Sequence, residues 1–428
     1  MYKRQRQWLS IHAPSLRNCF QPYHYFMLHF GIPIFILKTR NFVIWLDGTL
    51  YDIKYRKQLC SSYRNQSNAS VYSNRMERKS EYQKKSASSQ EKDMKRIEFI
   101  DVAKGITILL VIVGHTIPEG LMRTLIYSFH MPLFFFLSGY FYRNIPTKVL
   151  IRKKARQLLP PYYITSACLI IFNAGMLFIR QKTDELFPST ARLFFAALYG
   201  SGMDIHSPFP IPQIGAIWFL WALFFCFILM NLLYPLRYQP VLLILLAVLG
   251  IYSSSFLWLP LSFQAALPAV SFLYLGYQAR QQNIIEYLQK NVWIVFLFLP
   301  IWFLTAALGK EVVMAVNHYE CLPLNFVSAV TGIILILMLS LFLTNHAVQT
   351  KDYLKTMGEN TLLILCVHLL ELRIFPWYLI KNFMSEKLIF APWLTAAVVC
   401  LFKISIATIA VTVKRKIRSY SCKYKKSL

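Results

Sequence analysis

The sequence predicts an all-α fold: a polytopic membrane helix bundle of about ten transmembrane helices, with both termini in the cytoplasm. The first observation is composition, since 56% of the 428 residues are hydrophobic and only 15% are charged. Soluble domains carry about 25% charged residues. The second observation is that apolar stretches of spanning length recur from residue 97 onward. They are too long and too uniformly apolar for barrel strands, so a helix bundle is expected.

Short polar or proline-containing breaks separate these stretches and define the expected spans. We place them near residues 99–117, 123–142, 158–180, 213–234, 240–258, 262–280, 291–309, 322–345, 360–381 and 389–413.

The formal net charge of +27 sets the predicted orientation, because cations of membrane proteins gather in cytoplasmic loops. With ten spans and both termini inside, one cytoplasmic loop holds a cluster of cations: Arg143, Lys148, Arg152, Lys153, Lys154 and Arg156. Nucleic-acid binding is the rival explanation of the charge. It is disfavoured because the basic residues flank apolar spans and do not line one soluble face.

Three regions are expected along the chain. Residues 1–93 are basic and polar and are predicted to be largely disordered, with one apolar run at 26–37 that is too short to span a bilayer and reads as interfacial. Translation from Met94 would give a short basic segment that leads directly into the first span, so residues 1–93 are predicted to be dispensable or to arise from an upstream start. Residues 94–413 form the membrane domain, and 414–428 form a basic cytoplasmic tail.

The longest outer connection, near residues 181–212, contains two distinct segments. "ARLFFAALYGSG" reads as an amphipathic surface helix, and "HSPFPIPQ" as a proline-rich loop that either covers a site or simply connects two spans. The eight cysteines have no paired spacing, so neither a metal site nor a disulfide framework is expected.

The stretch "DVAKGITILLVIVGHT" carries ionisable residues at both ends of the first span. Lys104 and His115 are eleven residues apart, which is close to three helical turns, so both are expected on one face about 16 Å apart. Asp101 precedes Lys104 by three residues and is positioned to neutralise it. His130, in the next span, is followed by Pro132 and lies at a similar depth to His115, so the two histidines are candidates to face one another.

Ionisable residues also interrupt the ninth span. Such residues inside a bilayer usually face the bundle interior and pair with one another. We interpret Glu371 and Arg373 as a structural ion pair, and His368 as a weaker candidate site residue.

Several motifs together make the chain recognisable. "RIEFIDVAKGITILLVIVGHT" followed by "YSFHMPLFFFLSGYFYR" resembles the acyltransferase-3 family of integral membrane O-acyltransferases, and most closely its bacterial branch that acetylates surface polysaccharides. "IRKKARQLLPPYY", "GAIWFLWALFFCFIL" and "MGENTLLILCVHLL" are similar to later landmarks of the family, in the same order. The resemblance covers about residues 95–413.

The resemblance implies roles for individual residues. His115 matches the histidine that acts as catalytic base, and Lys104 matches a basic residue that is often arginine, so the bidentate grip of an arginine is absent here. Lys153 and Arg156 match a basic pair, with Arg152 and Lys154 beside them. The positive-inside rule alone explains this cluster equally well.

The function implied is transfer of an acetyl or similar short acyl group from cytoplasmic acetyl-CoA to a hydroxyl of a surface polysaccharide or lipid-linked sugar, in the inner membrane. The cation cluster would receive the phosphates of the donor. His115 would take the proton of the hydroxyl, and candidate donors to the tetrahedral intermediate are His130, Ser128 and Trp218. Direct transfer and an acyl-histidine intermediate both remain open. The alternative function is a transporter or flippase for the glycan, although the internal repeats typical of transporters are not visible.

Overall fold

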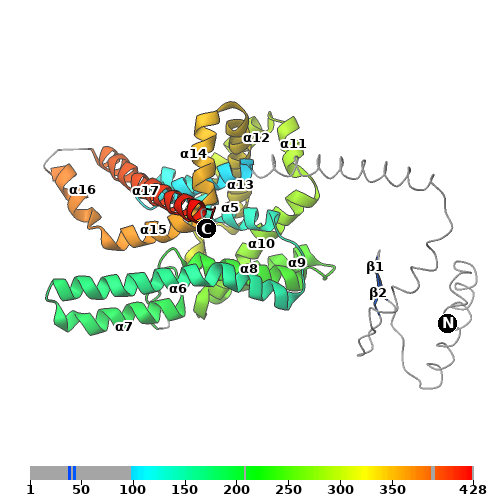
Figure 1. Cartoon of the computed structure of the whole chain (residues 1–428). Helices are drawn as coiled ribbons and strands as arrows, with labels where there is room; N and C mark the ends of the chain where they lie inside the picture. Colours follow the sequence, from blue (N-terminus) through cyan, green and yellow to red (C-terminus); the bar gives the residue numbers. More distant parts are fainter. Residues whose placement is uncertain (1–36, 40–41, 45–97, 207–208, 387–390, 427–428) are drawn as a thin grey trace, which may run out of the picture. The chain divides into compact units, whose positions relative to one another are not determined.

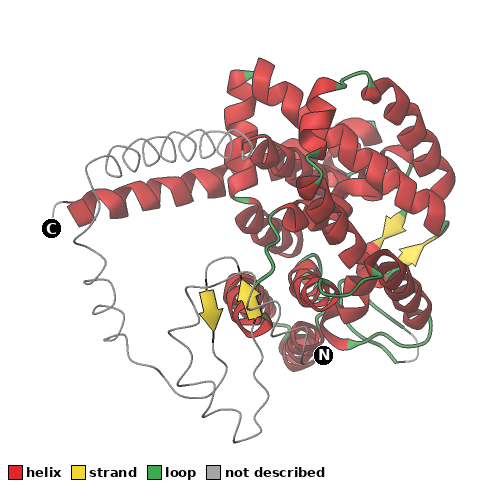
Figure 2. Ribbon diagram, turned by 90° about the vertical axis from the view of Figure 1, so that its right-hand side faces the viewer, coloured by secondary structure: helices red, strands yellow, loops and turns green. Residues whose placement is uncertain are grey.

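The computed structural model describes residues 37–39, 42–44, 98–206, 209–386 and 391–426, and within these ranges helices dominate (Figures 1 and 2). The chain divides into two units, Met1–Lys85 and Ser86–Leu428. In the first unit the described residues form an antiparallel hairpin of β1 (Leu37–Thr39) and β2 (Phe42–Ile44). The expected interfacial run at 26–37 lies outside the described residues apart from its last position.

The second unit begins with a helix over residues 98–114, called here the first helix. In chain order it is followed by α5 (Leu121–Tyr140), α6 (Thr147–Ile179), α7 (Thr183–Tyr199), α8 (Trp218–Leu233), α9 (Gln239–Ser254), η2 (Pro260–Ser262), α10 (Phe263–Gln281), α11 (Ile284–Lys290), α12 (Ile294–Gly309), β3 (Val312–Val313), η3 (Met314–Val316), β4 (His318–Tyr319), α13 (Leu322–His346), α14 (Val348–Glu359), α15 (Thr361–Ile374), α16 (Trp377–Glu386) and α17 (Pro392–Lys426). The two-residue strands β3 and β4 pair antiparallel.

All ten predicted stretches contain helical backbone. Among the described helices, four are long and apolar enough to cross a membrane, namely α5, α6, α13 and α17. Two more spans are counted if each bent pair is one crossing: α11 with α12, bent by 110°, and α15 with α16, bent by 69°. The fold is therefore that of a multi-pass helical membrane protein.

The third helix begins earlier than predicted. The sequence places the cations of residues 148–156 in a loop before a span at 158, whereas α6 is helical from Thr147 to Ile179. Pro146 directly precedes the helix, and residues 147–159 include no glycine or proline; the two prolines of α6, Pro160 and Pro161, come after the cations. The cation cluster is consequently a helical surface with a fixed direction for each side chain.

Glycines allow two helices of the core to cross at backbone contact. A Cβ added at Gly139 on α5 would lie 1.8 Å from the Leu273 carbonyl oxygen, and one added at Gly276 on α10 would lie 1.8 Å from that of Phe136. Small residues at such crossings let helices approach closely where lipid removes the hydrophobic drive for association. The largest apolar cluster of the core joins α5, α8, α10 and α13.

A second apolar cluster holds the first helix against α14, α15 and α17, through residues that include Ile112, Ile364 and Val411. At its beginning, Lys355 on α14 donates a hydrogen bond to the Glu98 carboxylate at 2.7 Å. This contact raises the pKa of Lys355. The first helix is thus fixed on one side by the cluster and leaves its other side open to the bundle interior.

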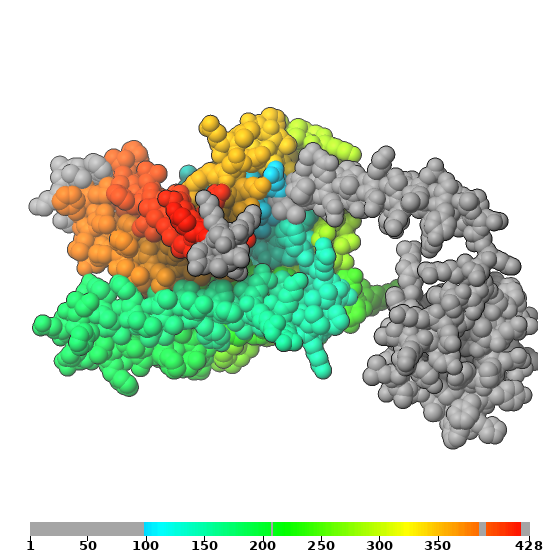
Figure 3. Space-filling model, viewed as in Figure 1, coloured from blue at the N-terminus to red at the C-terminus, as the bar shows by residue number. Residues whose placement is uncertain are grey.

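The long connection after α6 behaves as predicted in its first half. The expected amphipathic segment is part of α7, which runs beside α6 (Figure 1). Figure 3 shows α6 and α7 (green) along one edge of the face in view, with α15 to α17 (orange to red) beside them. The proline-rich loop then returns to the bundle, where Gly215 has a φ of 92° that favours glycine and turns the chain into α8.

Candidate active site

A cavity of about 640 Å³ lies inside the bundle between the two apolar clusters. Its walls come from the first helix, α5, α6, α8, α15 and the loops around residues 202–216 and 311–315. The ionisable side chains that line it are Lys104, His115, Arg123, Tyr127, His130, Lys154, Glu311 and Arg373. Lys104 and His115 therefore share one face of the first helix, as predicted from their spacing.

One end of the cavity carries two cations and is called here the lysine end. Lys104 lies 3.0 Å from the Asp101 carboxylate, which confirms the predicted pair, and its ammonium is 5.5 Å from the centre of the Phe141 ring. Lys154 lies 3.4 Å above the centre of the Phe227 ring. Cations held against aromatic faces keep their charge in a partly apolar wall.

The other predicted cations of α6 lie elsewhere. Arg152, Lys153 and Arg156 are exposed and do not line the cavity. The resemblance favours Lys153 and Arg156 as the basic pair. On α6, however, it is the side chain of Lys154 that faces the cavity. Lys154 is thus the residue of this cluster that the structure brings to the site.

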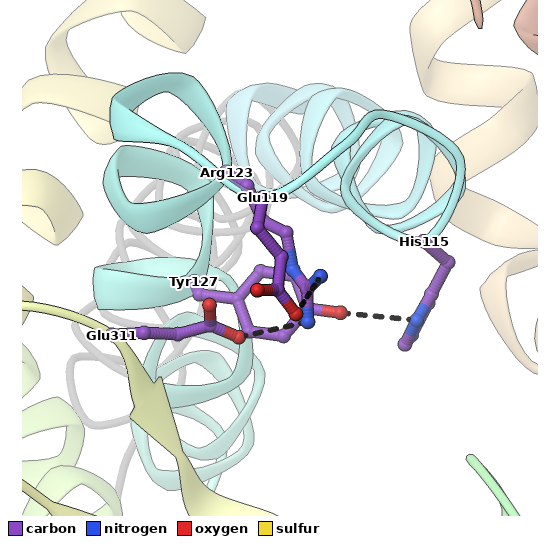
Figure 4. Close-up of polar contacts among 5 residues, drawn as sticks. All are labelled: His115, Glu119, Arg123, Tyr127 and Glu311. Atoms are coloured by element: carbon purple, nitrogen blue, oxygen red, sulfur yellow. Dashed lines mark hydrogen bonds and ion pairs between the residues drawn. The ribbon is translucent and has the colours of Figure 1, made fainter.

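His115 is the first residue after the first helix, and its backbone N–H still donates to the Val111 carbonyl. Its Nδ1 lies 3.1 Å from the Tyr127 hydroxyl on α5, as Figure 4 shows. A second ring, that of His368 on α15, lies 5.6 Å away between ring centres. His115 is accordingly held between two helices, with its side chain exposed to the cavity.

Charged groups surround Tyr127 at this end, called here the histidine end. Arg123 lies 3.0 Å from the Glu311 carboxylate and 3.3 Å from that of Glu119 (Figure 4). The Arg123 guanidinium is 5.0 Å from the centre of the Tyr127 ring. Glu311 follows α12, so the ion pair links α5 to the segment that leads into β3.

His130 contributes differently from the prediction that the two histidines face one another. Tyr127 lies between them, with its ring 5.9 Å from that of His115 and 4.8 Å from that of His130. Nδ1 of His130 is 2.9 Å from the Ile126 carbonyl oxygen, which can only accept, so this nitrogen carries the proton. In the neutral ring Nε2 is then an acceptor and does not donate to an oxyanion.

The other two predicted donors also differ. The Ser128 hydroxyl donates to the Leu125 carbonyl, accepts from the Trp302 indole and does not line the cavity. Trp218 does line it, and its indole N–H makes no hydrogen bond within the described part of the chain. Of the three candidates, Trp218 is the one whose donor is available to a substrate.

The predicted pair of Glu371 with Arg373 is wrong. Oε1 of Glu371 lies 2.7 Å from Nδ1 of His368 and 3.7 Å from the ammonium of Lys403 on α17. Residues two apart on a helix point in different directions, whereas residues three apart are neighbours, which explains why His368 is the partner. Arg373 is exposed and lines the cavity.

Two important residues escaped sequence reasoning although signals for them were present. Tyr127 precedes His130 by three residues and so shares its helix face. Lys403 is an isolated cation inside an apolar span, a position at which a charge is expensive and usually has a partner. Within the described ranges, no group of three or more His, Cys, Asp or Glu side chains is placed to hold a metal ion.

The structure is an apolar helix bundle with an interior cavity. Two lysines line one end of the cavity, and a histidine lies beside a tyrosine at the other. This arrangement is typical of a membrane protein that handles a polar substrate. The sequence profile described as "Acyltransferase domain" matches residues 97–412. The chain therefore belongs to the acyltransferase-3 family.

One curated relative supports this assignment. The chain is 29% identical over 153 residues to the nodulation protein NolL of Mesorhizobium japonicum. The aligned region covers 31% of this chain and 35% of NolL. The match thus spans about a third of that relative's length. No solved structure matches the chain.

Proposed function

We propose that the protein transfers an acetyl or similar short acyl group from cytoplasmic acyl-CoA to a hydroxyl of a cell-surface polysaccharide or lipid-linked sugar. The observation that carries the proposal is one cavity lined by Lys104 and Lys154 at one end and by His115 at the other. A polyanionic donor needs cations and an acceptor hydroxyl needs a base, and this cavity supplies both.

The proposed orientation is ten crossings of the inner membrane with both termini in the cytoplasm. The lysine end then opens toward the cytoplasm, where acyl-CoA is made, and the histidine end toward the outer face. The basic residues of α6 and of the end of α17 would lie on the cytoplasmic side, in agreement with the positive-inside rule.

On this proposal the donor enters between Lys104 and Lys154. Its phosphates remain near these cations, and exposed Arg152, Lys153 and Arg156 attract it from solution, because long-range attraction needs no fixed contact. The uncharged thioester end extends along the first helix. Asp101 already neutralises Lys104 in part, so Lys154 provides the stronger attraction for phosphate.

The chemistry is direct acyl transfer. In the tautomer required, Nδ1–H of His115 donates to the Tyr127 hydroxyl oxygen, so Nε2 is unprotonated and takes the proton of the acceptor hydroxyl. The oxygen bonds to the carbonyl carbon, and the indole N–H of Trp218 donates to the oxyanion of the tetrahedral intermediate. The carbon–sulfur bond then breaks, and the departing thiolate takes the proton from His115.

The test compares His115→Ala and His115→Gln with the native chain in cells. O-acylation of the surface glycan, glycan export and the amount of inserted protein are measured together. We expect acylation to fall by at least about 100-fold, the lower range for a general base, with protein amount unchanged. The matched control is His346→Gln, a surface histidine at the end of α13 that does not line the cavity.

Two outcomes would contradict the proposal. Normal acylation by stably inserted His115 variants would exclude the catalytic role. Loss of glycan export in the same variants would instead favour the transporter or flippase, since an acyltransferase leaves export intact.

A further inference from the structure

His368, Glu371 and Lys403, called here the buried triad, form a charged group inside the bundle. Their side chains are 1%, 4% and 3% exposed. Trp377 closes the group on one side, because its indole N–H donates to the Glu371 carbonyl and its ring lies 5.0 Å from the Lys403 ammonium. The triad thus joins α15 to α17 beside His115, and Trp377 adds α16 to the group.

Stability alone is a poor reason for such a group. Removing charges from water is costly, and well-packed apolar residues of similar volume are often as stabilising as a buried ion pair. Most of the neighbouring positions on α15 and in the first half of α17 are apolar. The presence of three ionisable side chains at this buried position therefore calls for a functional reason, which the neighbouring residues can indicate.

The neighbour of the triad that indicates such a function is His115, whose ring centre lies 5.6 Å from that of His368. Nδ1 of His368 lies 2.7 Å from Oε1 of Glu371, which is an ion-pair contact. Both ring nitrogens of His368 are buried, and neither makes a hydrogen bond of good geometry within the described part of the chain. At this separation two imidazole rings interact directly or through a hydrogen bond to one bridging water molecule. His368 is therefore a second polar ring beside the candidate base.

The charges around His115 are arranged in compensated groups. On the α5 side, Arg123 is paired with Glu119 and Glu311. On the α17 side, Lys403 is paired with Glu371. Without these carboxylates, two cations would flank a histidine that becomes positively charged when it accepts a proton. Of these carboxylates, only that of Glu371 also contacts a ring adjacent to His115.

We propose that His368, held by Glu371, is a positioning residue for His115, and that Glu371 compensates the positive charge that His115 carries while it holds the acceptor proton. This rests on the proposed function. The proton moves from the hydroxyl to His115 and then to the departing thiolate, and neither His368 nor Glu371 changes its own proton count. Lys403 keeps the triad close to neutral before the reaction.

The test uses the full chain in membrane vesicles, with acetyl-CoA and the glycan acceptor varied separately. We expect His368→Gln to lower kcat at least about tenfold, as loss of a group that orients a base does, while KM for both substrates stays within twofold. The double variant Glu371→Gln with Lys403→Met keeps the interior uncharged and should show the same loss of kcat. His346→Gln is again the control.

A structural role would produce a different result. Loss of protein and of thermal stability, with normal kcat in the fraction that remains folded, would overturn the inference. Native kcat in folded His368→Gln would do the same, and if that variant does not fold, the double variant decides. An inactive His115→Ala beside a fully active His368→Gln contradicts only this inference, whereas an active His115→Ala contradicts the proposed function.

Discussion

The Tyr127 hydroxyl and Nδ1 of His115 lie 3.1 Å apart and join α5 to the end of the first helix. This contact ties the ring of the candidate base to α5, in addition to its proximity to His368 on α15. It also connects His115 to the ion pairs of Arg123, which lies over the same tyrosine ring. The orientation of His115 therefore depends on α5 as much as on its own helix.

Tyr127→Phe removes the hydroxyl and keeps the ring. We expect kcat to fall between about twofold and tenfold, the effect of one neutral hydrogen bond, with protein amount unchanged. Acyl transfer in membrane vesicles measures it. Tyr252→Phe, at an exposed position on α9, is the control, and equal activity of both variants would show that the contact does not orient His115.

The two neighbouring lysines of α6 provide a matched pair for donor binding. Lys154→Met should raise KM for acyl-CoA about tenfold or more, because a contact between two charged groups is lost inside the cavity. Lys153→Met removes only one of several exposed cations that attract the donor from solution, so KM should change less than twofold at physiological salt, where each surface charge is partly screened. The reverse order would place the donor outside this cavity.

Stability should respond asymmetrically to changes in the buried triad. Glu371→Gln alone leaves the Lys403 charge buried without its carboxylate and should cost about 3 to 5 kcal/mol. Adding Lys403→Met should recover most of that loss. Thermal unfolding in detergent measures both variants, and equal melting temperatures for the single and double variants would mean that Lys403 reaches water.

The helix crossing at Gly276 should not accept a methyl group. Gly276→Ala places a Cβ 1.8 Å from a backbone oxygen of α5, so the helices must separate, at a cost of at least about 2 kcal/mol. Gly175→Ala on α6 meets nothing within 4 Å and should be neutral or stabilise by up to about 1 kcal/mol. The thermal stability of the two alanine variants in detergent checks this difference.

Sequence reasoning located the helices well because their signal is local. Each predicted apolar run contains helix, although α11 and α14 lie between the predicted spans and were missed. The eleven-residue spacing correctly places Lys104 and His115 on one wall of the cavity. The start of α6 was missed because the positive-inside rule describes where cations lie in a membrane and not whether their backbone is helical.

The contacts between helices were harder to predict, because one sequence contains little information about which faces meet. Lys403 and Glu371 are 32 positions apart in sequence and belong to different helices, so only the packing of α17 against α15 brings them together. For the same reason Lys154 could not be distinguished from Lys153 by position alone. Tyr127 could have been found, since its helix face already carried His130.

The distance along the first helix has a consequence for substrate choice. Lys104 and His115 are separated by about 16 Å along the first helix. On the proposed mechanism this separation fixes the distance required between the anionic head of the donor and its reactive carbonyl. A thioester on a shorter stalk would dock without reacting. Only the small acyl group would then cross the barrier between the two sides of the membrane, driven by thioester cleavage and without an ion gradient.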